Sequence, residues 1–232
     1  RLIREKDKNR LAGDQSYLKP EETRRIFKER GWNTVVAFQT RNAPHRSHEY
    51  LQLTALRLTD GLFVNPIIGP KKDGDFKDKY ILGAYKVLVN SSGLKKKILL
   101  STFHTHMRYA GPKEAVFHAL VRKNFGCTHM IIGRDHAGVG DYYGTYEAQE
   151  IFDNFNEKEL GIKILKYENA FYCRGCGEVV FEGQCDHDEQ QRLFVSGTEL
   201  RQRLSAGEKI PAEFMREEVA RYLLKYKDNL FV

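Results

Sequence analysis

The stretch TVVAFQTRNAPHRSHE, Thr34 to Glu49, decides the fold. Its opening TVVAFQT is short, apolar and rich in β-branched residues, which is typical of a strand buried on both faces. Polar residues follow in Arg41–Glu49, and from Ser47 leucines recur at helical spacing until about Gly61. The stretch therefore predicts a strand, a polar loop and a helix in direct succession.

The same alternation extends along most of the chain. Four further strands are predicted at Leu62–Gly69 with a break at Pro66, Lys96–Phe103, Thr128–Gly133 and Ile162–Tyr167. Four further helices are predicted at Pro20 to Gly31, Asp78–Asn90, Gly111–Gly126 and Tyr146–Phe155. Strands that alternate with helices of this length indicate an α/β fold, a Rossmann-like parallel sheet with helices on both faces.

The last part of the chain departs from this alternation. A cysteine-bearing hairpin, similar to a zinc ribbon, is predicted at 171–187, and two helices follow, SGTELRQRLSAG and the amphipathic EEVARYLLKY, separated by Pro211. We therefore divide the chain into an α/β domain at 1–167, which carries the expected catalytic site and begins with an N-terminal remnant at 1–16, and a C-terminal subdomain at 168–232.

The loop after the first strand carries unusual chemistry. His45 and His48 are three residues apart at a predicted helix start, where unpaired N–H groups and the helix dipole favour phosphate. A histidine pair there can donate hydrogen bonds to phosphate oxygens as charge shifts in a transition state. Taken alone, H-x-x-H is weak evidence for a site, because two surface or capping histidines are commoner.

A second loop, GRDHAG at Gly133–Gly138, follows the predicted strand at 128–133. Its glycines permit a close approach of the backbone to a ligand. The alternative is a polar turn in which Asp135 satisfies backbone amides, but that leaves Arg134 and His136 without a role. Because ligands bind beyond the carboxyl ends of parallel strands, we expect the two loops to meet at one site.

Composition restricts the function classes. With 41% hydrophobic and 30% charged residues the chain is not of the disordered type, and its net charge of +7 fits a solvated basic surface, anionic small substrates or nucleic acid. No apolar run approaches the ~20 residues that span a bilayer, and the start lacks a signal-peptide pattern, so we expect a cytoplasmic protein without membrane contact. The chain begins at Arg1 rather than Met, so we expect it to be either a trimmed chain or one piece of a longer polypeptide.

Together these motifs resemble one enzyme family. QTRNAPHRSHE resembles the Q-T-R-N-P-x-H-x-x-H segment of ATP sulfurylases, and GRDHAG is identical to their second signature. Met107–His129 and Val195–Pro211 resemble further stretches of the family, in the same order, and the similarity runs from about Tyr17 to Val232. The resemblance implies a nucleotidyltransferase-type sheet and the reversible reaction of ATP with sulfate to adenylyl sulfate (APS) and pyrophosphate, by direct in-line attack on the α-phosphate.

The chain also departs from the family pattern. Ala43 stands where the family commonly has proline, with Pro44 following, and Ser47 replaces the glycine of the related H-x-G-H motif. We expect the family's β-rich N-terminal domain to be largely missing from these residues. The expected assembly is a homo-oligomer.

The resemblance also assigns residues. It implies a sulfate site and a nucleotide site that share the first loop, with Mg²⁺ accompanying the triphosphate. The implied sets are catalytic Thr40, Arg41, Asn42, His45 and His48; sulfate-binding Gln39, Arg41 and Ala137; and ATP-binding Gln39, Asn42, His45, His48, Gly133, Arg134, Asp135, His136 and Ala170.

The hairpin sequence AFYCRGCGEVVFEGQCDH offers a separate metal site. Cys173, Cys176, Cys185 and His187 have the residue types of a structural Cys₃His site for Zn²⁺, which some prokaryotic ATP sulfurylases resembling this chain also carry. A redox-active C-x-x-C pair and unligated cysteines are the alternatives, and the aspartates flanking His187 can compete with it as ligands. The cysteine outside the hairpin and the remaining histidines are interpreted as ordinary packing or polar residues: Cys127, His104, His106, His118 and His129.

Two other functions stay open. The chain is compatible with another H-x-x-H nucleotidyltransferase, and less well with a zinc-ribbon module that binds nucleic acid through its basic surface. No G-x-x-x-x-G-K-[ST] sequence is present, so this chain does not contain a fused P-loop kinase.

Overall fold

The computed structural model describes residues 16–195 and 197–232. Its centre is a parallel sheet in the order β3-β2-β1-β5-β6, with β4 paired to the far end of β2. The strands are β1 (Val35–Thr40), β2 (Gly61–Ile68), β3 (Ile98–Leu100), β4 (Phe103–His104), β5 (His129–Ile132) and β6 (Lys163–Lys166). The predicted N-terminal remnant lies outside the described residues except for position 16.

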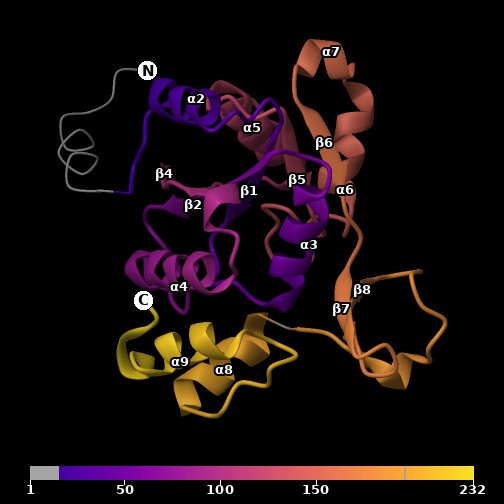
Figure 1. Cartoon of the computed structure of the whole chain (residues 1–232). Helices are drawn as coiled ribbons and strands as arrows, with labels where there is room; N and C mark the ends of the chain where they lie inside the picture. Colours follow the sequence, from indigo (N-terminus) through magenta and orange to yellow (C-terminus); the bar gives the residue numbers. More distant parts are fainter. Residues whose placement is uncertain (1–15, 196) are drawn as a thin grey trace.

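Helices cover both faces of this sheet, as predicted (Figure 1). One face packs on α3 (Arg46–Leu56) and α4 (Asp78–Ser91), and the other on α2 (Pro20–Glu29), α5 (Gly111–Asn124), α6 (Glu147–Glu150) and α7 (Glu157–Leu160). Within β1, Val36 and Phe38 join the first core while Val35 and Ala37 join the second. This alternation explains why the strand is apolar at successive positions.

The predicted break at Pro66 is wrong for β2 itself, which runs without interruption. The break lies in the neighbouring chain, where β3 ends at Leu100 and β4 begins at Phe103. Pro66 stands opposite this gap, since Val64 pairs with Leu100 and Ile67 pairs with Phe103. A proline lacks an N–H to donate, so it is tolerated where the ladder has no partner strand.

Two other predicted elements differ in detail. The helix predicted at 146–155 is a single α turn, α6, continued by a 3₁₀ turn at Ile151–Asn154. The strand predicted at 96–103 begins with a 3₁₀ turn at Lys95–Lys97 before β3. Both differences are local departures from regular hydrogen bonding inside correctly placed elements.

The cysteine hairpin forms β7 (Ala170–Cys173) and β8 (Glu178–Phe181), and β9 (Arg192–Leu193) adds a third antiparallel strand. Beyond it, α8 (Gly197–Ala206) and α9 (Glu217–Leu224) pack beneath α4, and their apolar side chains belong to the same core as α3 and α4. Figure 1 shows this C-terminal layer in yellow under the sheet. The domain boundary at 167 stays a proposal; it marks where parallel pairing gives way to antiparallel pairing.

The strand order creates one crevice. From β1 the chain proceeds through β2 to β3 on one side, and β5 and β6 lie on the other side of β1. The connections that leave β1 and β5 therefore run in opposite directions, which opens a crevice at the carboxyl ends of these two strands. Among the described helices none combines the length and apolar character required to cross a bilayer.

The contact between α4 and α9 depends on a glycine, and we predict that Gly83→Ala destabilises the protein. A Cβ at this position would lie 1.7 Å from Oη and 2.3 Å from Cζ of Tyr222. Overpacking of this kind costs about 1–3 kcal/mol, more than the helix propensity gained from alanine, which is about 1 kcal/mol. Urea unfolding of the wild type and the variant measures the difference.

The matched control is the same substitution in a Tyr222→Ala background. With the ring removed, Gly83→Ala should raise the free energy of unfolding, because only the gain in helix propensity remains. An equal loss in both backgrounds would show that the ring contact is not the cause.

Candidate functional site

A cleft of about 700 Å³ lies at the crevice between the carboxyl ends of β1 and β5. The twelve residues that the sequence analysis assigned to sulfate, nucleotide or catalysis all line it. They are Gln39, Thr40, Arg41, Asn42, His45, His48, Gly133, Arg134, Asp135, His136, Ala137 and Ala170.

The first loop is held by its own polar groups. The backbone N–H of Asn42 donates to Oγ1 of Thr40 at 3.0 Å, which closes a tight turn directly after β1. His45 is the N-cap of α3, and its Nδ1 accepts from the His48 amide at 3.4 Å. The proton of neutral His45 therefore lies on Nε2, which remains free to donate to a ligand.

The two histidines stack, with ring centroids 3.7 Å apart and planes at 25°. Burial, reinforced by His48, lowers the pKa of His45 well below its usual value. Burial also lowers the pKa of His48 to about 4, against an opposing effect of the Ala43 carbonyl. Both rings are uncharged at neutral pH, so they offer N–H donors rather than positive charge. His45 thus caps α3, which is one of the two interpretations of H-x-x-H, and it also lines the cleft.

Residues 211–216 brace the first turn of α3. The Arg46 amide donates to the Phe214 carbonyl at 2.8 Å, and Nε of Arg46 donates to the Ala212 carbonyl at 2.9 Å. One residue after His48, the buried carboxylate of Glu49 accepts from Nε of Arg216 at 2.7 Å. These contacts join the C-terminal layer to the helix that carries both histidines.

Arg41 is positioned by two residues that the sequence analysis did not assign. Its NH1 lies 3.9 Å from Oδ2 of the buried Asp75, and its guanidinium lies 5.0 Å from the centroid of the Tyr109 ring. A carboxylate and an aromatic face both favour a guanidinium. Asp75 follows β2 and Tyr109 follows β4, so only the folded chain brings them to Arg41.

The second loop adopts a constrained backbone. Asp135 and Ala137 have φ values of 52° and 58°, in the left-handed region that disfavours side chains. At Gly138 a Cβ would lie 2.0 Å from Oδ1 of Asp135, which explains the glycine. The Asp135 amide donates to Thr145 at 2.9 Å, and the Ala137 carbonyl accepts from Gly111 at 3.0 Å. The strain is thus held by neighbouring segments, as is common at binding sites.

His118, which the sequence analysis interpreted as an ordinary packing residue, contacts a residue of the cleft. His118 is fully buried on α5, and its Nδ1 lies 3.2 Å from Nε2 of His136 in the cleft. Cys127, by contrast, is a buried core residue as predicted, and burial raises the pKa of its thiol. His106 is exposed, and His129 begins β5 at the end of the strand away from the cleft.

Other cleft residues were missed by the sequence analysis, although a signal was present. Most of them belong to segments that resemble the family or lie close to a predicted site residue. The sequence analysis gave their side chains no role. These residues are Met107, Glu168, Asn169, Phe194, Val195, Gly197 and Thr198.

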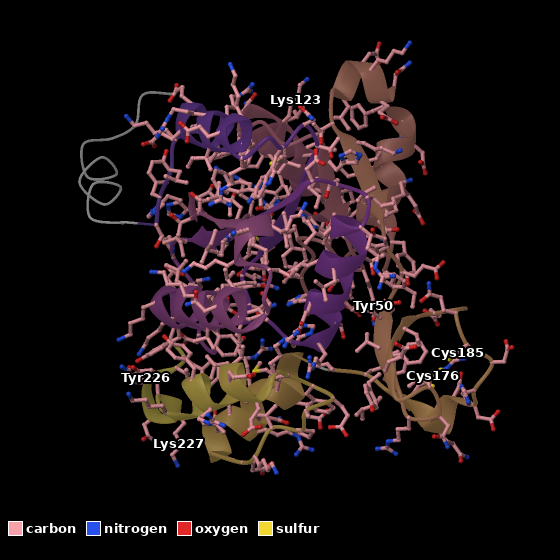
Figure 2. All side chains as sticks on the ribbon, in the orientation of Figure 1. Tyr50, Lys123, Cys176, Cys185, Tyr226 and Lys227 are labelled. Atoms are coloured by element: carbon pink, nitrogen blue, oxygen red, sulfur yellow. The ribbon has the colours of Figure 1, made fainter. Side chains whose placement is uncertain are left out.

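The hairpin cysteines and His187 form one cluster. Among the described residues, the ligand atoms of Cys173, Cys176, Cys185 and His187 all lie within 4.8 Å of one another, and the four thiols of the chain are free of disulfides. A tetrahedral site with bonds of about 2.3 Å needs ligand separations of about 3.8 Å, so the cluster is compatible with zinc. Figure 2 shows Cys176 and Cys185 side by side near the β7–β8 hairpin, away from the sheet.

Gly175 leaves room for His187 to join this cluster. A Cβ at Gly175 would lie 2.3 Å from Cδ2 of His187, so a side chain there would displace the ring. Nδ1 of His187 lies 3.5 Å from Sγ of Cys176. The structure therefore brings His187 to the three thiols, although aspartates flank it in the sequence.

Comparison with known proteins identifies the family. The sequence profile named ATP-sulfurylase matches residues 14–226, which is most of the chain. The chain belongs to the ATP-sulfurylase family. The sequence motifs therefore resemble this family because the chain is a member of it.

Curated relatives carry the name sulfate adenylyltransferase. The chain is 53% identical over 209 residues to that of Chloroflexus aurantiacus, covering 90% of this chain and 55% of the relative. It is 54% identical over 215 residues to that of Pyrococcus abyssi, covering 93% and 56%. The chain thus spans little more than half the length of the curated relatives it matches.

Solved structures support the fold of this ATP-sulfurylase family member. A structure titled hexameric APS kinase from Thiobacillus denitrificans superposes with a TM-score of 0.69 at 22% identity, covering 90% of this chain and 39% of that one. A bifunctional NMN adenylyltransferase/ADP ribose pyrophosphatase from Francisella tularensis gives 0.51 at 13% identity, covering 84% and 50%. These likenesses show the predicted nucleotidyltransferase-type sheet and nothing finer.

We predict that stability falls as the pH drops below about 6.5. The native state keeps His48 neutral down to a pKa of about 4, while the unfolded chain binds a proton at the ordinary histidine pKa of about 6.5. The unfolded state then holds more protons between these values, so acid favours unfolding. His48→Gln should reduce the slope of unfolding free energy against pH in this window by up to about 1.4 kcal/mol per pH unit.

The slope of the unfolding free energy against pH is measured by urea unfolding at several pH values between roughly 4.5 and 7.5, the range in which histidines titrate. His106→Gln, at an exposed histidine, is the matched control and should keep the wild-type slope. Identical slopes for His48→Gln and the wild type would contradict the assignment of a neutral, buried imidazole.

Proposed function

We propose that the chain carries the catalytic site of a sulfate adenylyltransferase, which converts ATP and sulfate to APS and pyrophosphate. The main observation in support is a pair of unsatisfied polar groups in the cleft. Oε1 of Gln39 and NH1 of Arg41 are buried without a hydrogen-bond partner among the described residues. Buried polar groups are nearly always satisfied, so a polar ligand is expected beside them.

Sulfate fits this position. Arg41 supplies a permanent charge with a planar fork of donors, and the Gln39 amide can turn its NH₂ group toward an oxyanion. The Ala137 amide across the cleft adds a backbone donor from the strained loop. Asp75 and Tyr109 hold the guanidinium in place, so little is lost in ordering it when sulfate binds.

The nucleotide occupies the rest of the cleft. Asn42, His45 and His48 contact its phosphates at the start of α3, and residues 133–136 with Ala170 contact its nucleoside part. His45 donates from Nε2, because its Nδ1 is used in capping. Arg134 supplies a second permanent charge, which offsets the repulsion between sulfate and triphosphate.

The reaction is a direct displacement. A sulfate oxygen attacks the α-phosphorus, the bond from that phosphorus to the bridging oxygen breaks, and pyrophosphate leaves with the electron pair. Positioning and charge stabilisation suffice for this in-line transfer, and no enzyme-bound intermediate forms. Mg²⁺ accompanying the triphosphate would be held mainly by phosphate oxygens and water, and it would neutralise part of the triphosphate charge.

For the cysteine cluster we propose a structural Zn²⁺ site with Cys173, Cys176, Cys185 and His187 as ligands. Four protein ligands leave no open position for a substrate, which argues for a structural rather than a catalytic role. The hairpin is short and has a small core of its own, in which the buried residues are Phe171, Cys173 and Val180. Metal binding would then stabilise the strands that lead from and back to the cleft.

The activity is tested by pyrophosphate release from ATP, Mg²⁺ and sulfate. Arg41→Ala and His48→Ala should each lower kcat/KM at least tenfold, which corresponds to about 1.4 kcal/mol of barrier. The first variant should mainly raise the KM for sulfate, because it removes a charge that also binds the ground state. Circular dichroism confirms that both variants are folded.

Matched controls are Arg25→Ala on the exposed face of α2 and His129→Gln at the opposite end of β5. Both should retain wild-type turnover. The assignment is contradicted by unchanged turnover in Arg41→Ala and His48→Ala. It is equally contradicted if the folded wild type releases no pyrophosphate with ATP, Mg²⁺ and sulfate, which would favour another H-x-x-H nucleotidyltransferase.

The zinc site is tested by metal analysis of the purified chain. We expect about one Zn²⁺ per chain in the wild type, and substantially less in Cys185→Ser. Cys127→Ala replaces the thiol outside the cluster and should keep the full zinc content. Full occupancy in Cys185→Ser, or zinc loss in Cys127→Ala, would place the metal elsewhere.

A further inference from the structure

Helix α5 buries a row of polar side chains behind the second loop. Glu114, His118 and Arg122 are four residues apart, so they lie along one face of the helix, and each is at most 3% exposed. A buried helix face is normally apolar, because an unsatisfied polar group costs about 1–3 kcal/mol. The row therefore needs a role beyond packing.

Glu114 fixes one end of this row. Its Oε1 accepts from the Arg108 amide at 2.9 Å, and its Oε2 accepts from the Ala110 amide at 3.0 Å. The same Oε1 lies 3.6 Å from Nε2 of His118. This separation is beyond hydrogen-bond distance, and Nε2 of His118 has no hydrogen-bond partner among the described residues. The nearby carboxylate nevertheless favours the proton on Nε2 rather than on Nδ1.

His118 then fixes His136. With the His118 proton on Nε2, its Nδ1 can only accept, and its neighbour at 3.2 Å is Nε2 of His136. A hydrogen bond between the rings therefore requires the His136 proton on Nε2. The hydrogen bond between the rings then runs from His136 to His118, and the His118 proton lies on the side of Glu114.

Both rings are uncharged. Burial, then the charge of Arg122, and then His136 and Arg108 lower the pKa of His118 far below its usual value. Burial and then Arg122 lower the pKa of His136 to about 3. Since Nε2 of His136 is occupied by His118, the nitrogen left for a ligand in the cleft is Nδ1, and in this tautomer Nδ1 is an acceptor.

We propose that His118, oriented by Glu114, is a positioning residue that makes His136 a hydrogen-bond acceptor for a donor group of the nucleotide. This inference rests on the proposed function, which puts ATP in the cleft. Phosphate and sulfate oxygens at neutral pH accept hydrogen bonds, so they do not suit an acceptor. The donors that a nucleotide offers are its ribose hydroxyls and its adenine amino group, and His136 recognises one of these. It differs in this respect from His45, whose free nitrogen donates.

The tautomers are measured directly by ¹⁵N NMR of histidine-labelled protein at neutral pH, with His136 assigned by the loss of its signals in His136→Gln. The expected result is a neutral ring with a protonated Nε2 and a bare Nδ1 for both His118 and His136. A cationic His136, or a proton on its Nδ1, would overturn the proposal whatever the variants do.

Two substitutions then test the positioning role. His118→Phe removes the acceptor, so His136 should lose its single tautomer, and the KM for ATP should rise at least fivefold while kcat changes less than twofold. His118→Asn keeps an amide oxygen near the place of Nδ1 and should restore most of the affinity. The matched control, His129→Asn, should alter neither constant. If His118→Phe and His118→Asn are equally impaired, or the loss falls on kcat alone, the positioning role is wrong.

Nucleotide analogues identify the donor. Binding of 2′-deoxy-ATP, 3′-deoxy-ATP and purine riboside triphosphate is compared with binding of ATP in the wild type and in His118→Phe. One analogue should bind the wild type at least fivefold more weakly, and that penalty should shrink in His118→Phe. Equal penalties in both proteins for all three analogues would overturn the assignment of a nucleotide donor to His136.

These measurements separate the two proposals. A wild-type chain that binds ATP but releases no pyrophosphate with sulfate would contradict the proposed function, while the tautomers and analogue penalties would still report on His118. An active wild type with the opposite His136 tautomer would contradict only the positioning role.

Discussion

The site depends on the reversal of strand order beside β1. Parallel strands direct their carboxyl ends to one edge of the sheet, and at most positions the following helix closes over that edge. Between β1 and β5 the connections leave in opposite directions, so the edge stays open. The loop at 41–45 and the loop at 133–138 therefore line the same cleft. Apart from Ala170, each assigned cleft residue lies in one of these loops, at the end of β1 or β5, or in the first turn of α3.

Electrostatics within the cleft divide into two kinds of group. Arg41 and Arg134 carry permanent charge, whereas His45, His48 and His136 are kept neutral by burial. A cleft crowded with cations would repel itself when empty, and neutral imidazoles avoid this cost while still forming directional hydrogen bonds. The tautomer of each ring, which its second nitrogen determines, then decides whether that ring donates or accepts.

The C-terminal third supports the cleft from outside the sheet. Its hairpin leaves the cleft after Ala170 and returns to it at Phe194, so the antiparallel pairing of β7 with β9 sets the spacing of two parts of the wall. The segment 211–216 holds the first turn of α3 through Arg46 and Glu49. Rigid support of this kind would matter for the proposed in-line transfer, which is sensitive to small displacements of the reacting groups.

The sequence by itself determined the sheet, the two loops and the cysteine cluster. Each depends on local information: continuous apolar residues in β1, motifs of adjacent residues, and the short spacing from Cys173 to His187. Tertiary structure decided the strand order and the partners that meet across it. Asp75 and Tyr109 reach Arg41 from separate strands. Glu114, His118 and Arg122 have the spacing of an ordinary polar helix face, and only the packing of α5 against the second loop buries that face and turns it toward His136, because burial depends on neighbours distant in the chain.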